Sequence, residues 1–187
     1  MSRRTASRAL LAVAMSVSLA ACGSDDDDAA SPASTSAAEP SAQACETVPP
    51  TAEPDPDVSA DLAAKPEVPA TDAAPPCGLV ISDVVVGTGA EAVDGATAAV
   101  KYVGAFYETG EEFDSSWSRS PDETIAVPLG ACRVIPGFEQ GIEGMKVGGR
   151  RMITIPSDLG YGPEGSPPVI PGDATLVFVM DLVEVTP

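Results

Sequence analysis

The uneven distribution of aromatic residues limits where this chain can build a folded core. All eight aromatic side chains lie in the second half of the 187 residues. Residues 23–78 contain none of them, yet hold ten of the nineteen prolines. A segment this poor in large apolar side chains cannot bury enough surface to offset the entropy lost on ordering. We therefore expect residues 22–78 to be a disordered tether rich in Pro, Ala and acids, and residues 79–187 to form one compact domain.

The first 21 residues have the pattern of an export signal. Three arginines precede an apolar run over residues 9–21, which is shorter than the roughly 20 residues needed to span a bilayer. The run ends at Leu19-Ala20-Ala21-Cys22, which resembles the bacterial lipobox and implies cleavage before Cys22 and lipid on its thiol. The alternative is a plain secretory signal with an incidental Cys22. We expect an extracytoplasmic protein anchored to the cell membrane as a lipoprotein, since two or more acyl chains anchor stably.

Charge and the absence of histidine exclude several classes of function. Ten basic residues face 28 acidic ones, a net charge of -18, and nucleic-acid binding requires a basic surface. Without histidine the chain cannot be a Ser-His-Asp or Cys-His hydrolase or hold a histidine-containing zinc centre. No glycine spacing matches a phosphate-binding loop. We expect no cofactor and no metal.

Four cysteines leave the disulfide pattern open. If Cys22 carries lipid, Cys45, Cys77 and Cys132 remain in an oxidising compartment, where disulfides persist. Three is an odd number, so at most one internal bridge forms. The pair is either Cys45–Cys77 or Cys77–Cys132, and spacing alone does not choose between them.

Hydrophobic patterns over residues 79–187 predict a β-rich domain with one short helix. The longest strand, over 174–185, places Leu176, Phe178, Met180 and Leu182 on one face. Only residues 137–145 have helical periodicity. An antiparallel sheet with one helix packed against it is an α+β fold. The other strands are expected over residues 79–86, 96–107, 111–115, 124–129 and 150–156.

Aromatic residues beside loops rich in Gly and Pro suggest an apolar cleft with few polar groups. The alternative, which composition alone favours, is that they only form the core. The domain reads VKYVG at residues 100–104, GEEFDSS at 110–116, VIPGF at 134–138 and GIEGMKVGG at 141–149. It continues with YG at 161–162, VIP at 169–171 and ATLVF at 174–178. In this order the motifs resemble FKBP-type peptidyl-prolyl cis-trans isomerases, over about residues 79–187.

The resemblance implies a twisted antiparallel sheet wrapped around a short helix, with an apolar cleft between them. Asp114 and the Tyr161 hydroxyl would be its polar groups, and the Ile135 N–H a donor to a substrate carbonyl. Three positions depart from the family: Phe138 replaces the usual Trp, Ile125 replaces an aromatic, and Ser166 stands where His is common. By resemblance, Phe138 forms the floor of the cleft, and its walls are Tyr102, Phe113, Val134, Ile135, Tyr161 and Phe178.

The same resemblance implies a prolyl isomerase that acts on X-Pro bonds of exported proteins and also binds FKBP-class macrolides. We expect a monomer that needs neither nucleophile nor metal, because the reaction only rotates an imide bond. One alternative is a binding or chaperone module that keeps the proline pocket without useful turnover, as the change at Phe138 and at Ser166 would allow. Another is a β-domain that binds an unrelated envelope ligand.

The segment that carries Phe113 and Asp114 sets a geometric requirement. Neighbouring residues of a regular strand point to opposite faces, but a family-like cleft needs both side chains inside it. We therefore predict a β-bulge at residues 113–115. Inside the cleft, Asp114 would accept a hydrogen bond that positions Tyr161 or the substrate. The alternative is that Asp114 is a solvated turn residue.

Overall fold

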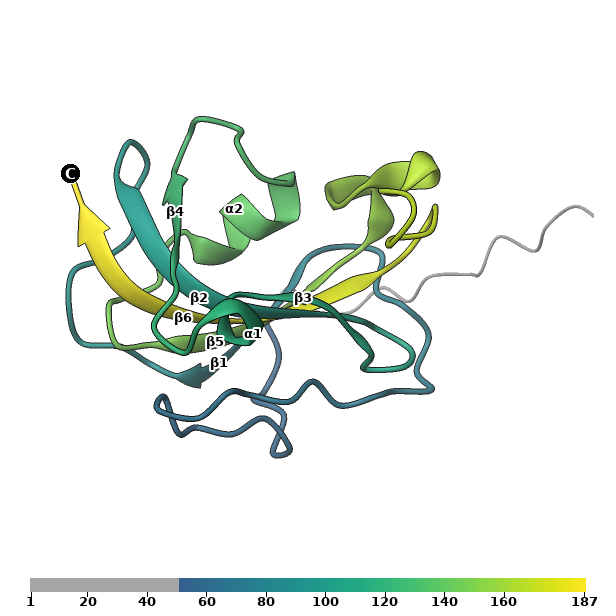
Figure 1. Cartoon of the computed structure of the whole chain (residues 1–187), viewed down its shortest axis with the longest axis horizontal. Coiled ribbons are helices and arrows are strands. Elements are labelled where there is room, and N and C mark those ends of the chain that lie inside the picture. The colour runs from purple at the N-terminus through teal and green to yellow at the C-terminus, as the bar shows by residue number, and fades with distance from the viewer. Residues whose placement is uncertain (1–50) are drawn as a thin grey trace, which may run out of the picture. The chain divides into compact units, whose positions relative to one another are not determined.

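The structure is a computed structural model, and it describes residues 51–187 (Figure 1). The predicted export signal, the predicted lipidation site Cys22, and Cys45 all lie outside the described residues. Within residues 51–187, no helix is both long enough and apolar enough to cross a membrane.

Six strands lie where the hydrophobic pattern predicts them, each bounded within two residues of the prediction. The predicted helix is α2, Pro136–Ile142, and it ends earlier than expected because Glu143 is extended and Gly144 has a φ of +74°. The pattern missed the four-residue helix α1, Ser116–Arg119, and two 3-10 turns, η1 (Ser157–Leu159) and η2 (Gly162–Glu164), since three or four residues establish no periodicity. The strands are β1 Val80–Val85, β2 Thr97–Phe106, β3 Glu112–Ser115, β4 Ile125–Pro128, β5 Arg150–Ile155 and β6 Leu176–Thr186.

The strands form one antiparallel sheet in the order β1-β5-β6-β2-β3. One edge of β2 pairs with β6 along its whole length, and the other edge is shared by β4 and β3. Helix α2 lies on one face of this sheet (Figure 1). The predicted inward face of β6 is confirmed, because its four residues share one core cluster with Phe138 and Ile142 of α2.

Glycine lets α2 approach the sheet closely. A Cβ atom at Gly137 would lie 2.4 Å from the Ile155 Cγ2 atom of β5, and one at Gly141 would lie 2.6 Å from the Ile153 Cδ1 atom. Both glycines lie on the helix face that meets the sheet, four residues apart. Their missing side chains bring the helix backbone near β5 and so fix the depth at which Phe138 sits.

Residues 51–70, here called the strap, run across the face of the sheet away from α2 (Figure 1). The Ala52 N–H donates to the Ile81 carbonyl at 2.8 Å, and the Ser82 hydroxyl donates to the Glu53 carbonyl at 3.0 Å. The Val58 side chain is only 4% exposed. For these residues the prediction of a disordered tether is wrong, because a few apolar side chains and backbone groups dock onto a preformed sheet.

A buried ion pair holds the strap from beneath. The Arg150 guanidinium is fully buried and contacts Asp181 twice, at 2.5 Å through Nε and at 2.6 Å through Nη2. Its Nη1 atom donates to the Ser59 carbonyl at 2.6 Å, and Nη2 donates to the Ala64 carbonyl at 3.0 Å. A buried charge is tolerated only when paired and fully hydrogen-bonded, and the strap carbonyls complete that shell. Every residue has a backbone carbonyl, so the amino-acid composition of the strap could not predict this contact.

The structure excludes one of the two disulfide alternatives. Cys77 is disulfide-bonded, whereas Cys132, on the loop between β4 and α2, is a free and exposed thiol. A Cys77–Cys132 bridge is therefore wrong.

Candidate functional site

One cleft of about 400 Å³ opens beside α2. That volume is within the usual range for small-ligand sites. All eight residues that the sequence placed in the site line it together. Three further side chains complete the lining: Ile125, Cys132 and Arg133.

Aromatic rings from four elements form the base of the cleft. The Phe138 ring lies edge-on to Phe178 of β6, with centroids 5.1 Å apart, and edge-on to Tyr102 of β2 at 5.8 Å. Phe113 of β3 packs edge-on against Phe178 at 5.6 Å. Such edge-to-face pairs are favourable arrangements of aromatic rings. Phe138 is 4% exposed, so it forms a rigid floor.

Gly104 in β2 makes room for this cluster. A Cβ atom at that position would lie 2.7 Å from a ring carbon of Phe178 and 2.8 Å from one of Phe113. Any side chain there would push the two rings apart. The glycine in the motif at residues 100–104 therefore has a steric role in the site.

The predicted bulge at residues 113–115 is confirmed. Gly104 pairs with Asp114 and Ala105 pairs with Glu112, so Phe113 is an extra residue with no partner on β2. The bulge turns the Phe113 ring and the Asp114 carboxylate to the same side, and both line the cleft. Asp114 is thus a strand residue that lines the cleft, and its side chain is 48% exposed.

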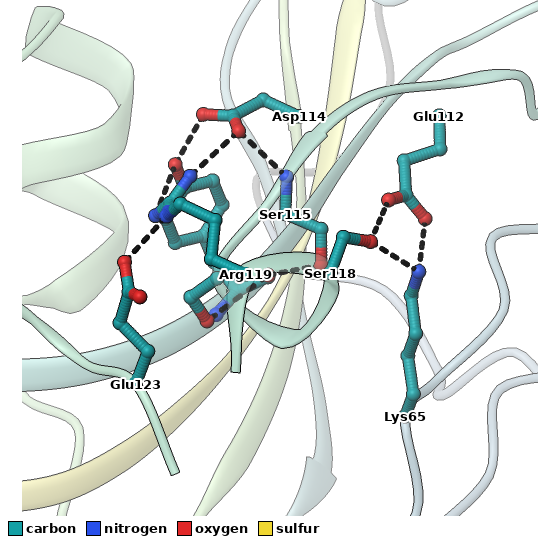
Figure 2. A network of polar contacts seen from close by, with 9 residues as sticks. Lys65, Glu112, Asp114, Ser115, Ser118, Arg119 and Glu123 are labelled. Carbon is teal, nitrogen blue, oxygen red and sulfur yellow. Dashed lines mark hydrogen bonds and ion pairs between the residues drawn. The ribbon is translucent and has the colours of Figure 1, made fainter. Parts of the chain in front are cut away.

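Asp114 is the centre of a hydrogen-bond network at the cleft wall (Figure 2). The Tyr102 hydroxyl donates to its Oδ2 atom. The Ser115 N–H and the Arg119 Nη1 atom each donate to Oδ1 at 2.8 Å. The carboxylate accepts from Tyr102 and not from Tyr161, whose side chain is 40% exposed and hydrogen-bonds no described residue. A contact between Asp114 and the substrate stays a prediction.

Burial and the hydrogen-bond network shift the pKa of Tyr102 upwards. Burial first, and then its hydrogen bond to Asp114, raise the pKa of Tyr102 above the usual 10.0. The Arg119 guanidinium lowers that pKa by a smaller contribution. The hydroxyl therefore remains a donor to Asp114 throughout the neutral range.

Arg119 is a site residue that the sequence reasoning missed. The four-residue helix α1 turns the chain back so that Arg119 reaches Asp114 on one side and Glu123 on the other (Figure 2). Its guanidinium also lies over the Tyr102 ring, 5.7 Å from the centroid. The sequence gives only a weak signal for these ion pairs. Asp114 lies five residues before Arg119 and Glu123 four residues after it, and ion pairs between exposed residues usually stabilise a protein little.

The strap reaches the outer side of the same turn (Figure 2). Lys65 contacts Glu112 at 2.6 Å and donates to the Ser118 hydroxyl at 2.9 Å. Ser118 in turn donates to Glu112 at 2.7 Å. These contacts support the segment that carries the bulge and α1 from the side away from the cleft.

The loop between β4 and α2 forms the opposite wall. The Glu139 carboxylate, in the first turn of α2, accepts the Gly130 N–H and so ties the start of the loop to the helix. At the other end, the Ile135 carbonyl accepts the Phe138 N–H at 3.0 Å. The Ile135 N–H donates to no described residue, which leaves it available to a ligand carbonyl. The loop thus presents Val134 and Ile135 in a fixed position.

Comparison with known proteins identifies the family. Residues 89–183 match the family described as FKBP-type peptidyl-prolyl cis-trans isomerase. The chain belongs to this family. Two curated relatives match this chain over nearly their whole length. They are a "Probable FK506-binding protein" of Corynebacterium glutamicum and an "FK506-binding protein" of Streptomyces anulatus. The first is 51% identical over 119 residues, which are 64% of this chain and 97% of that relative. The second is 48% identical over 123 residues, which are 65% of this chain and 97% of that relative.

A solved structure agrees with the fold. The "Crystal structure of AtFKBP13" has a TM-score of 0.53 and 36% identity, and it covers 59% of this chain and 94% of that one. The protein is therefore an FKBP-type enzyme, a peptidyl-prolyl cis-trans isomerase with an α+β fold. Of its three departures from the family pattern, Phe138 and Ile125 lie in the cleft lining, while Ser166 lies outside it and its N–H donates to the Ile170 carbonyl.

Proposed function

We propose that this FKBP-type isomerase is exported, is anchored at the outer face of the membrane by lipid on Cys22, and acts on X-Pro bonds of exported proteins. The observation that supports the site is the convergence of all eight expected residues on one cleft. The signal and lipobox pattern before Cys22 supports the location.

The reaction that this cleft would catalyse breaks no bond. Rotation about an X-Pro imide crosses a barrier of about 18–20 kcal/mol and takes tens of seconds or longer without a catalyst. The twisted transition state loses amide resonance and is less polar than the planar ground state. An aromatic surface that excludes water and packs against the proline ring therefore binds the twisted form better than the planar form, which is the requirement for catalysis.

Fixed donors would hold the flanking peptide while the imide rotates. The unpaired Ile135 N–H suits the carbonyl that follows the proline, and the exposed Tyr161 hydroxyl can reach another peptide group. Because the Ile135 N–H is held in place before the substrate arrives, little reorganisation of this donor is needed at the transition state. Neither a nucleophile nor a proton shuttle is required, which fits a chain without histidine.

Isomerase turnover in this cleft is tested with the full chain and a short X-Pro peptide, by exchange NMR spectroscopy without a coupling protease. We expect catalysed exchange that falls with Val134→Trp, because the larger ring would occupy the mouth of the cleft. Exchange that continues unchanged would place the active surface elsewhere. Val93→Trp, at an exposed position outside the cleft lining, is the matched control.

The relatives named FK506-binding proteins suggest that the same cleft takes macrolides of that class. We expect such a macrolide to inhibit exchange competitively, since it would occupy the aromatic floor. Inhibition that leaves KM unchanged would assign the macrolide to another surface.

The anchor is tested separately from turnover. We expect the full chain expressed in a bacterium to fractionate with the membrane and to incorporate labelled fatty acid. Cys22→Ser should abolish both the labelling and the membrane association. A Cys22→Ser protein that stays membrane-bound would refute the anchor and leave the activity untouched.

A further inference from the structure

Arg133 differs from every other cation in the described part of the chain. Residues 51–187 contain seven Lys and Arg side chains, and six of them have a partner within the domain. Arg133 forms no hydrogen bond, ion pair or ring contact with any described residue. The six pairs are Lys65–Glu112, Lys101–Trp117, Arg119–Asp114, Lys146–Glu91, Arg150–Asp181 and Arg151–Asp83.

The unpaired guanidinium lies in the cleft lining. Arg133 lies next to Val134 and two residues before Ile135, whose N–H is free. The loop that carries it is tied to α2 at Gly130 and at Ile135, so its backbone position is fixed. The side chain itself is exposed and can move to meet a ligand.

Within the described residues, the cleft has a free cation and no free anion. Its single lining carboxylate, Asp114, already accepts hydrogen bonds from Tyr102, Arg119 and Ser115. The chain as a whole has 28 acidic residues against 10 basic ones. Carboxylates therefore greatly outnumber cations, yet none of those in the described residues pairs with Arg133. An unpaired guanidinium beside the cleft in such an acidic protein is suited to a ligand.

We propose that Arg133 is a specificity residue, which binds the carboxylate of an Asp or Glu close to the proline in the substrate. A guanidinium matches a carboxylate with two parallel hydrogen bonds, which makes this the preferred anion for an arginine in contact with a peptide. The inference rests on the proposed function of the cleft and narrows its substrate class to acidic X-Pro segments.

The net charge of the protein acts in the opposite direction. A field from 18 excess negative charges disfavours the approach of an acidic peptide. At physiological salt this field is screened beyond about 8 Å, whereas a direct contact with Arg133 is screened less. A preference for acidic substrates would therefore report the local contact and not the field.

The test compares matched peptides that carry Glu or Gln at one position, either one or two residues before or after the proline. Exchange NMR spectroscopy gives kcat/KM for each peptide with the full chain. We expect a Glu/Gln ratio of about 3 to 5 at one of these positions, the upper part of the range that an exposed ion pair supplies. Arg133→Gln should lower that ratio to about 1, Arg133→Glu should favour a Lys peptide, and Arg133→Lys should retain part of the ratio. Added salt should also reduce it.

Lys146→Gln is the matched control, since it removes one exposed positive charge outside the cleft lining and should keep the ratio. A ratio near 1 at every position, or one that survives Arg133→Gln, would overturn the role of Arg133 while catalysis itself stands. A ratio that falls equally in Lys146→Gln would assign the effect to net charge and overturn it as well. Absence of turnover on every peptide would reject the proposed cleft mechanism, and the specificity role with it.

Discussion

Replacing Asp114 with Leu should lower kcat/KM about 10-fold while the fold remains intact. The substitution removes the acceptor of the buried Tyr102 hydroxyl and frees Arg119 from the cleft wall. A hydrogen bond to a charged group contributes about 1.5–3 kcal/mol. The Asp114 side chain is 48% exposed, so the lower end of that range applies, and about 1.4 kcal/mol corresponds to a factor of 10 in rate.

A double variant shows whether the two residues act as one unit. Tyr102→Phe alone leaves Asp114 with its contacts to Ser115 and Arg119, so it should cost less than Asp114→Leu. If Asp114 acts mainly by holding Tyr102, the double variant should be no slower than Asp114→Leu. Losses that simply multiply would show that the two side chains contribute independently.

The assay is exchange NMR spectroscopy on a neutral X-Pro peptide, with urea unfolding to confirm that each variant is folded. Asp72→Leu makes the same chemical change at an exposed position outside the cleft lining and controls for the loss of one negative charge. Full activity of Asp114→Leu would refute the reasoning. The carboxylate would then only stabilise the wall, and the cleft would act through apolar contact alone.

Four further outcomes are expected. Phe138→Ala should cost more activity than Asp114→Leu and about 3–5 kcal/mol of stability in urea, because it removes the buried floor. Arg150→Met should lower the free energy of unfolding by about 3–5 kcal/mol, because it leaves Asp181 buried and unpaired. Adding Asp181→Leu should recover most of that stability. Hydrogen exchange should still show that the strap opens more often in the double variant. Since the pKa of Tyr102 is raised, the stability advantage over Tyr102→Phe should be complete below pH 10.0 and shrink above it. A bulky maleimide should react with the free thiol of Cys132 and block turnover, and an X-Pro peptide should slow the labelling; Cys132→Ala should be insensitive to the reagent.

The sheet and the main features of the cleft could be predicted because they depend on side chains with strong patterns. Alternation along β6 placed Phe178 correctly, and the helical spacing of Phe138 and Ile142 located α2. The bulge at Phe113 followed from a conflict between strand geometry and the motif, since both neighbours had to face inward. The resemblance supplied the roles, and strand geometry supplied the distortion that those roles require.

The strap and Arg119 escaped prediction for different physical reasons. The strap is held largely through backbone carbonyls that accept from Arg150, and any sequence of similar extended shape offers the same groups. The composition of the strap therefore predicted disorder, although the buried Arg150 guanidinium needs the carbonyls of the strap as hydrogen-bond acceptors. Arg119 depends on α1, which is a single turn without periodicity. The sequence predicted that Asp114 lies in the cleft. It did not predict the turn at α1 that brings Arg119 back to this carboxylate.

The polar groups of the cleft are divided between its two walls in a way that suits an X-Pro peptide. On the wall formed by β2, β3 and α1, Asp114 already accepts hydrogen bonds from three donors of the protein. Among the described lining residues, the Ile135 N–H, the Tyr161 hydroxyl and the Arg133 guanidinium are free, and each of them can donate. Proline lacks an N–H, so the segment around it offers the cleft mainly carbonyl oxygens. Donors that meet these oxygens can hold both sides of the imide without opposing its rotation above Phe138. Catalysis and specificity would then be separable, with the aromatic floor setting the rate and Arg133 setting which segments are bound.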